Sequence, residues 1–188
     1  MKSIVAILGL LVAGFAVLRA DKLPGGFGIM YDSEAGYCFT MTAPKGWILD
    51  NETMKGQGVC AVFYPVGESW DKSETVMYVN TRPKPRDAHG IEDAVKIDID
   101  DMHAHGSSGS KAAKIGEVKL RDGRSAVIYE YTGDAGGNFE RTAFVMEAKG
   151  IDAVVISARS RKALDAALPA FDRLVASYQF MGPFKLEK

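Results

Sequence analysis

The sequence lacks the features that mark several large protein classes. It has only two cysteines in 188 residues, which excludes a disulfide-dense mini-fold and a zinc site with four cysteine ligands. Its 23 basic and 24 acidic residues nearly balance, so no basic excess indicates nucleic-acid binding. The hydrophobic content of 47% is too high for a disordered chain. What remains is a globular domain large enough to bury a substantial core.

The common catalytic motifs are missing as well. The sequence contains no Gly-x-Ser-x-Gly elbow, no His-Glu-x-x-His, no Cys-x-x-Cys and no glycine-rich phosphate loop. It also contains no internal repeat and no low-complexity tract. From motifs alone we therefore predict no catalytic residue, no cofactor and no metal ligand.

The N-terminus carries the clearest functional signal. Residues 4–18 form an unbroken run of 15 apolar and small residues behind Lys2. A membrane-spanning helix needs about 20 such residues, whereas a secretory signal needs fewer. We predict that residues 1–20 are a signal peptide and that the protein is periplasmic or secreted. The alternative is a short uncleaved anchor, which would be the protein's one contact with a membrane.

Export changes the interpretation of the two cysteines, Cys38 and Cys60. In an oxidising compartment two thiols commonly form a disulfide, and this one would close a loop of 23 residues. We predict that bridge. The alternative is two buried free thiols that pack as small hydrophobic side chains.

The remaining chain alternates strand and helix patterns. Residues 21–35 mix proline, glycine and charge, so we predict a tether there. Apolar alternation and turn residues then predict strands over 37–42, 58–65, 75–81, 114–120, 124–132, 138–148 and 151–158. The segment Ala153–Ile156 has no alternation, which predicts a central strand covered on both faces.

Two segments have the apolar spacing of a helix. The first, over 91–104, places one stripe at Ile91, Val95, Ile99 and Met102. The second has a stronger stripe at Leu164, Leu168, Phe171, Val175 and Tyr178. Because a proline removes a helix hydrogen bond, Pro169 predicts either a helix start near it or a kink.

This order of elements predicts an α+β fold. Strands joined by short turns form an antiparallel sheet, here of about six to seven strands, and the helices pack on it. We predict one domain over residues 36–188.

Four segments carry a family resemblance. They are the opening strand and Pro-x-Gly-Trp end of residues 36–47, Ala61–Pro65, Arg124–Ala126 and Ser177–Phe180. In this order they resemble the PsbP-like fold family, which includes an extrinsic photosystem II subunit and many small exported bacterial proteins. The resemblance implies a sheet sandwiched by helices and a binding, assembly or chaperone role rather than an enzyme. The photosystem role is not carried over, because the chain shows no chloroplast-type transit peptide.

One polar cluster, Asp98–His105, could bind a metal. On a helix Asp98, Asp101 and His105 lie on one side, whereas His103 and His105 diverge by about 200°. Its use in a metal-dependent hydrolase is our alternative function. The other interpretation is a solvated helix end, with the histidines favourably placed near a C-terminus.

Loops offer the other candidate binding residues. Trp70 lies in the polar loop 66–74, where it either forms a contact surface or folds back on the sheet. We predict binding through the loops 66–74 and 103–113, with Trp70, His103 and His105 as candidates. The expected function is an exported non-catalytic binding module. Its expected partner is another protein of the cell envelope, in an immunity, chaperone or envelope-assembly role.

Overall fold

Apolar and polar residues alternate along most of the strands, because successive side chains of a strand face opposite sides of a sheet. The computed structural model describes residues 22–32, 36–55, 57–133 and 136–183. Eight strands form a large antiparallel sheet in the order β1-β4-β5-β6-β10-β9-β8-β7. Their bounds are β1 (Lys22–Pro24), β4 (Trp47–Asp50), β5 (Val59–Pro65), β6 (Thr75–Pro83), β7 (Lys111–Lys119), β8 (Ser125–Thr132), β9 (Phe139–Met146) and β10 (Gly150–Ala158).

A second, smaller sheet joins the beginning of the domain to its end. It contains β2 (Phe27–Asp32), β3 (Tyr37–Thr42) and β11 (Gln179–Pro183), in the antiparallel order β11-β3-β2. The prediction of an antiparallel α+β fold is confirmed, with more strands than the expected six to seven.

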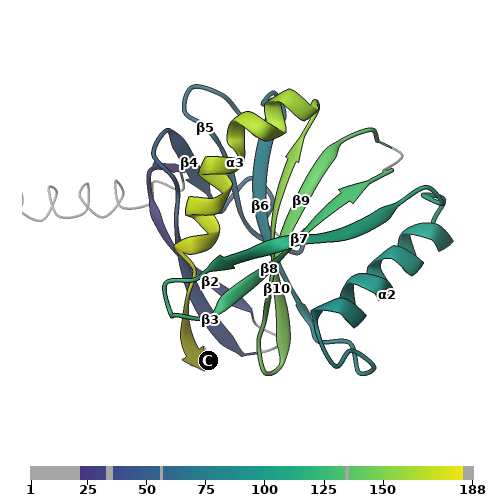
Figure 1. Cartoon of the computed structure of the whole chain (residues 1–188). Helices are drawn as coiled ribbons and strands as arrows, with labels where there is room; N and C mark the ends of the chain where they lie inside the picture. Colours follow the sequence, from purple (N-terminus) through teal and green to yellow (C-terminus); the bar gives the residue numbers. More distant parts are fainter. Residues whose placement is uncertain (1–21, 33–35, 56, 134–135, 184–188) are drawn as a thin grey trace, which may run out of the picture.

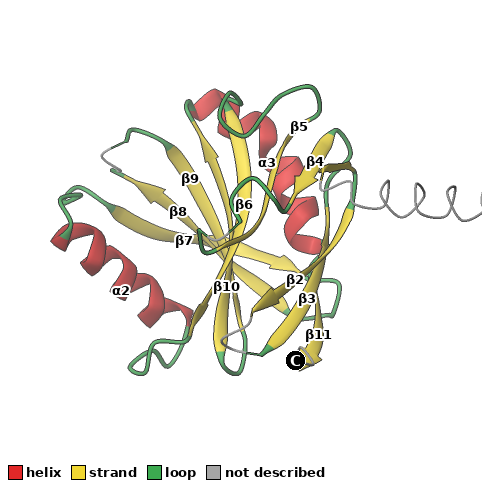
Figure 2. Cartoon of the chain, turned by 180° about the vertical axis from the view of Figure 1, so that it is seen from behind, coloured by secondary structure: helices red, strands yellow, loops and turns green. Residues whose placement is uncertain are grey.

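The two helices lie at different places on the large sheet. Helix α3 (Arg161–Ala176) crosses one face of the sheet. Helix α2 (Ile91–Ala104) lies near the edge strand β7 (Figure 1). Seen from behind, strand β6 passes in front of α3 (Figure 2).

Helix α3 begins before the proline that sequence suggested as its start. The Ser160 side chain accepts a hydrogen bond from the Ala163 backbone N–H at 3.2 Å, which caps the first turn. The helix continues through Pro169, and its ribbon bends within its length (Figure 1). Pro169 and Asp165 are both exposed, so water can reach the Asp165 carbonyl that loses its helix partner.

The two faces of the large sheet are covered differently. One face packs against α3 and the small sheet in the main core, with Phe39, Phe63 and Phe171 almost completely buried. The opposite face forms a smaller cluster with Ala94 and Val95 of α2. Along β6, Met77 and Val79 point into the main core, so Tyr78, Asn80 and Arg82 face the other side. The predicted burial of Phe171, Val175 and Tyr178, and of both faces of β10, is confirmed, whereas Leu168 packs against the same core and is only partly buried.

Two sequence predictions meet a different result, and a third is not tested. Residues 22–32, predicted as a tether, form β1 and β2, which pair with β4 and β3. Cys38 and Cys60 are free thiols rather than a disulfide. They lie in different sheets, and Cys38 alternates with Tyr37 and Phe39, which point into the core. The signal peptide predicted at residues 1–20 lies outside the described residues.

Candidate functional site

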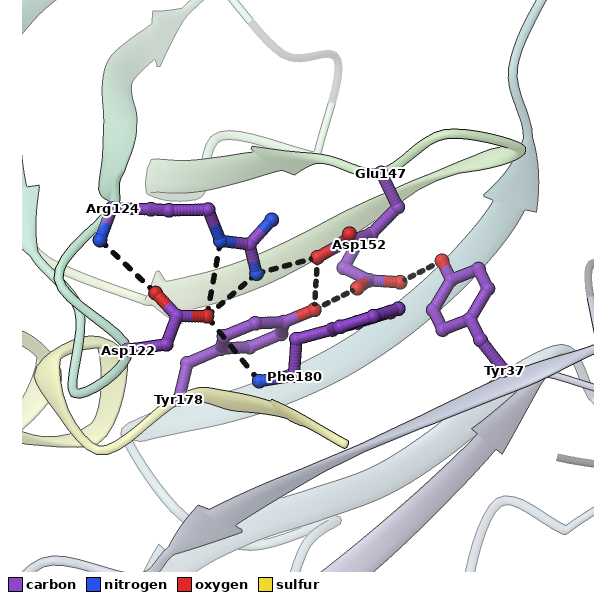
Figure 3. Close-up of polar contacts among 7 residues, drawn as sticks. All are labelled: Tyr37, Asp122, Arg124, Glu147, Asp152, Tyr178 and Phe180. Carbon is purple, nitrogen blue, oxygen red and sulfur yellow. Dashed lines mark hydrogen bonds and ion pairs between the residues drawn. The ribbon is translucent and has the colours of Figure 1, made fainter. Parts of the chain in front are cut away.

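A buried polar network joins the small sheet to the large one (Figure 3). The Tyr37 hydroxyl, from β3, donates to Asp152 Oδ1 at 2.6 Å. The Tyr178 hydroxyl, from the segment between α3 and β11, lies 2.6 Å from Asp152 Oδ2 and 2.7 Å from Glu147 Oε1. Since a phenol has one hydrogen, it donates to only one of these carboxylates at a time. Burial, followed by the charge of Asp152, raises the pKa of Tyr178, so the phenol keeps its proton.

An arginine continues the network toward the surface. One terminal nitrogen of Arg124 donates to Glu147 Oε1 at 2.8 Å and to Asp122 Oδ2 at 2.7 Å. The backbone N–H of Phe180 donates to the same Asp122 oxygen at 3.3 Å. The hydrogen bond to Asp122 is the main reason why the pKa of Arg124 is raised. The β7–β8 turn is thereby tied to the closing strand β11.

Gly150 allows Tyr37 to reach Asp152. A Cβ on Gly150 would lie 2.7 Å from the Tyr37 hydroxyl and 3.1 Å from the Arg82 carbonyl oxygen, so no side chain fits there. Asp152 itself has 0% exposure. Because solvent and substrate cannot reach the Asp152 carboxylate, the role of the network is to hold the two sheets together, and we call it the clamp.

The opposite face of the large sheet has a cavity of about 150 Å³. Its walls come from β6, β8, β9, β10 and α2. Three aromatic side chains line it, namely Tyr78, Tyr131 and Phe144. Tyr131 is only 8% exposed, and this burial raises the pKa of its phenol.

Arg82 and Asp98 form the polar edge of this cavity. Both terminal nitrogens of Arg82 donate to the Asp98 carboxylate, one of them at 2.8 Å to Oδ2. The Nε atom of Arg82 is buried and has no hydrogen-bond partner among the described residues. A buried donor without an acceptor is unusual in proteins.

The structure does not bring together Trp70, His103 and His105, the three predicted binding residues. Trp70 is half-buried and contacts Tyr78 edge-on, with 6.1 Å between ring centroids, so it folds back on the sheet beside the cavity. His103 Nε2 lies 2.8 Å from the Ser110 carbonyl oxygen, in a groove of about 770 Å³ between α2 and β7. His105 is exposed and lies against Asp101 of its own helix.

The cluster Asp98–His105 does not converge. Asp98 turns to Arg82, whereas Asp101 and His105 contact each other at the helix end. In the described part of the chain, no group of three or more histidine, cysteine, aspartate or glutamate residues could hold a metal ion. Neither described helix has the length and apolarity that a membrane crossing requires.

Sequence reasoning missed Tyr78 and Arg82. The signal was present in β6, where Tyr78, Asn80 and Arg82 alternate with apolar Met77 and Val79. An outward face with these three residue types differs from an ordinary solvated face, because tyrosine and arginine are enriched at binding surfaces.

Solved structures support the fold. The cyanobacterial PsbP protein, CyanoP, of Synechocystis sp. PCC 6803 is 17% identical, with a TM-score of 0.52 over 83% of this chain and 93% of that chain. The chain has a PsbP-like fold.

Two other structures are more distant from this PsbP-like domain. A mutant of protein Mog1 is 13% identical, with a TM-score of 0.49 over 82% of this chain and 95% of that one. A protein from Bacteroides thetaiotaomicron is 13% identical, with a TM-score of 0.42 over 85% of this chain and 50% of that one. No family model and no curated protein sequence matches the chain. At these identities the likeness concerns the fold alone.

Proposed function

We propose that this PsbP-like domain is an exported, non-catalytic module that binds a partner protein of the cell envelope through the open face of its large sheet. We define the open face as the surface around the 150 Å³ cavity together with Trp70. The observation that carries the proposal is this cavity, with aromatic walls and, at its edge, an arginine whose buried Nε has no hydrogen-bond partner among the described residues.

The composition of the open face supports a protein partner. Tryptophan, tyrosine and arginine contribute most of the binding energy in protein interfaces and cluster around small pockets. All three types occur here, at Trp70, Tyr78 and Arg82. Small-molecule and cofactor sites usually enclose about 300–1,000 Å³, which is larger than this cavity.

The alternative hydrolase has less support. Its proposed ligand Asp98 is held by two hydrogen bonds from Arg82, and the two histidines contact different backbone carbonyls. Export rests on the apolar run of residues 4–18, whose length suits a secretory signal.

Affinity capture from the native envelope, followed by reconstitution, tests the proposal. The wild-type protein is compared with Tyr78→Ala on the open face and with Asp172→Ala on the exposed side of α3. We expect the same partner to be recovered with wild type and Asp172→Ala, and to be lost with Tyr78→Ala. The purified partner should then bind in calorimetry with the same order. Retention by folded Tyr78→Ala, or a wild-type protein that captures no partner, would contradict the proposal.

The export part has its own measurement. Mass spectrometry of the protein purified from its native compartment should show a mature N-terminus that lacks residues 1–20. A retained N-terminus would instead support the uncleaved anchor.

A further inference from the structure

The large sheet ends in an edge strand, β7, that no described strand covers. Strand β7 pairs with β8, and in the described part of the chain no other backbone hydrogen bond involves residues 111–119. Alternate N–H and C=O groups of β7 therefore face outward, as donors and acceptors at the spacing of a strand. The chemistry that complements such a row is the main chain of another extended polypeptide.

Edge strands are commonly protected against such pairing by shortness, by proline or by a bulge. The opposite edge strand of the sheet, β1, has three residues and ends in Pro24. Strand β7 has nine residues, and its bulge lies between Lys114 and Gly116. Residues 111–114 pair with β8 in regular register before the bulge, so they offer an uninterrupted edge.

A groove of about 770 Å³ lies between this part of β7 and helix α2, which is beside the strand (Figures 1 and 2). Its apolar lining includes Val95 and Ile99 of α2, Ala112 of β7 and Tyr129 of β8. In a strand added to β7, every second side chain would point to the α2 side and enter the groove. The volume is within the range of about 300–1,000 Å³ that is usual for ligand sites, so several side chains fit.

The charges of the groove favour an acidic side chain in the occupant. Lys96 lies on the α2 wall and Lys111 on the β7 wall, and both are exposed without an ion pair to a described residue. With Lys114, the lining holds three lysines against the two acidic residues Glu92 and Asp93. Lysines by themselves discourage pairing at an edge, but a carboxylate on the added strand would complement them.

These observations lead to one mode of recognition. We propose that β7 and the groove bind an extended segment of a partner protein, which adds to the large sheet as an antiparallel strand beside residues 111–114. The segment points an apolar side chain toward Ile99 and Tyr129. Two residues along, on the same face of the strand, it places an acidic side chain near Lys96 and Lys111.

This surface goes beyond the proposed function, because it is separate from the open face. Helix α2 lies between the two surfaces. Its residues Asp98 and Met102 line the cavity of the open face, whereas Lys96 and Ile99 line the groove.

Nuclear magnetic resonance titration of the mature protein tests strand addition. The probe is the peptide acetyl-Thr-Val-Thr-Val-Thr-Asp-Thr-amide, whose valines and aspartate share one face of a strand. We expect it to shift the backbone amide signals of residues 111–114 and to leave those of Phe144 and Val155, in the cavity, unchanged. A probe that does not shift the signals of residues 111–114 would overturn the inference.

Methylation of the probe's main-chain nitrogens tests which edge of the added strand is used. One analogue is methylated on the threonine nitrogens and the other on the valine and aspartate nitrogens. Since alternate N–H groups of a strand face opposite edges, one analogue should lose binding and the other should keep it. Equal affinities of the two analogues would show that no strand is added to β7 and would overturn the inference.

Charge reversal tests the acidic side chain. A probe with lysine in place of aspartate should bind the wild-type protein about fivefold more weakly. The double variant Lys96→Glu, Lys111→Glu should prefer the lysine probe instead. Lys119→Glu, on the same strand but outside the groove, is the matched control and should keep the wild-type order. An unchanged order in the folded double variant would overturn the role of the carboxylate.

Two further results assign the surface. Signals of residues 111–114 that shift with protein concentration, without any probe, would assign the edge to a second copy of this chain and overturn the inference. Tyr78→Ala, on the open face, should bind the probe as the wild type does. If the probes fail while the envelope partner is lost only with Tyr78→Ala, the inference fails and the proposed function stands.

Discussion

The two faces of the large sheet differ in how they are covered and in how their polar groups are paired. One face is closed by α3 and the small sheet, and its polar groups form the clamp of Tyr37, Glu147, Asp152 and Tyr178. Within the described part of the chain, α2 covers only part of the open face, which keeps a cavity and a buried donor without a partner. Buried polar groups contribute to stability when they are fully paired, whereas a buried donor without an acceptor costs stability.

This comparison predicts that the residues that stabilise the fold and the residues that bind a partner lie on different faces of the large sheet. Substitutions on the closed face should lower the free energy of unfolding and change binding only through unfolding. Substitutions on the open face should have small effects on stability and large effects on binding. Four predictions follow this division, in order of decreasing effect.

The largest effect is expected at Phe171, which is 1% exposed in the main core. Phe171→Ala removes the ring and leaves a cavity, which should lower the free energy of unfolding by about 3–5 kcal/mol. The neighbouring Asp172→Ala, at an exposed position, should cost under about 0.5 kcal/mol. Urea titrations measure both. Similar losses would mean that the helix faces the sheet differently.

The hydroxyl of Tyr178 should contribute less than a core ring, but more than a hydroxyl on the open face. Tyr178→Phe removes one buried hydrogen bond from the pair Asp152 and Glu147, which keep their donors Tyr37 and Arg124, and this loss should cost about 1–3 kcal/mol. Tyr131→Phe makes the same chemical change in the cavity wall and should cost about 0.5 kcal/mol or less. Thermal and urea unfolding measure the stability loss of each variant. A larger loss for Tyr131→Phe than for Tyr178→Phe would contradict the comparison of the two faces.

A pH-dependent contribution should come from Glu130 on the closed face. Its carboxylate accepts hydrogen bonds from Arg161 of α3 and from Arg141 of β9. The Arg161 hydrogen bond, opposed by burial and aided by Arg141, lowers the pKa of Glu130 from 4.5 to about 2. Because the pKa is lower in the folded state, this stabilisation is complete above about pH 4.5 and is lost as the pH falls toward 2.

The comparison of wild type with Glu130→Gln isolates that contribution. The difference in unfolding free energy should be about 1 kcal/mol at pH 7, after allowance for solvent screening, and should shrink between pH 4.5 and 2. A difference that does not change with pH would show that the ion pairs do not cause it.

The smallest effect is expected from a reductant. Because Cys38 and Cys60 are free, dithiothreitol should change the free energy of unfolding by less than about 0.5 kcal/mol, whereas a disulfide closing this loop would contribute about 3 kcal/mol. Both thiols should react with iodoacetamide in unfolded protein that has not been reduced. Labelling that requires reduction would show a bridge, and the two sheets would then have to pack differently from this structure.

Local patterns were sufficient for the elements that bury one continuous face. The spacing of Ile91, Val95 and Ile99 predicted α2 over 91–104, and the helix has these bounds. The unbroken apolar run in β10 predicted its central position. These features can be predicted from sequence because a helix or strand that buries one face has apolar residues at a regular spacing.

Residues 21–35 show where local patterns fail. Their proline, glycine and charge are typical of a loop, yet residues 22–32 form strands because β4 and β3 supply pairing partners. The candidate site was equally hidden. Trp70 was a candidate binding residue from the sequence and folds back beside Tyr78, but Arg82 reads as an ordinary solvated residue until Asp98 and the aromatic wall are placed around it.

The sequence by itself determined the α+β class, the two helical faces, the central strand and the likeness to PsbP-like domains. Tertiary structure alone decided that the cysteines lie in separate sheets, that Tyr37 and Tyr178 meet at Asp152, and that the face of the large sheet opposite α3 has a cavity. The reason is physical. The spacing of apolar residues in a segment shows only which of its own faces are buried. Pairing between strands and polar contacts between distant residues depend on partners far along the chain.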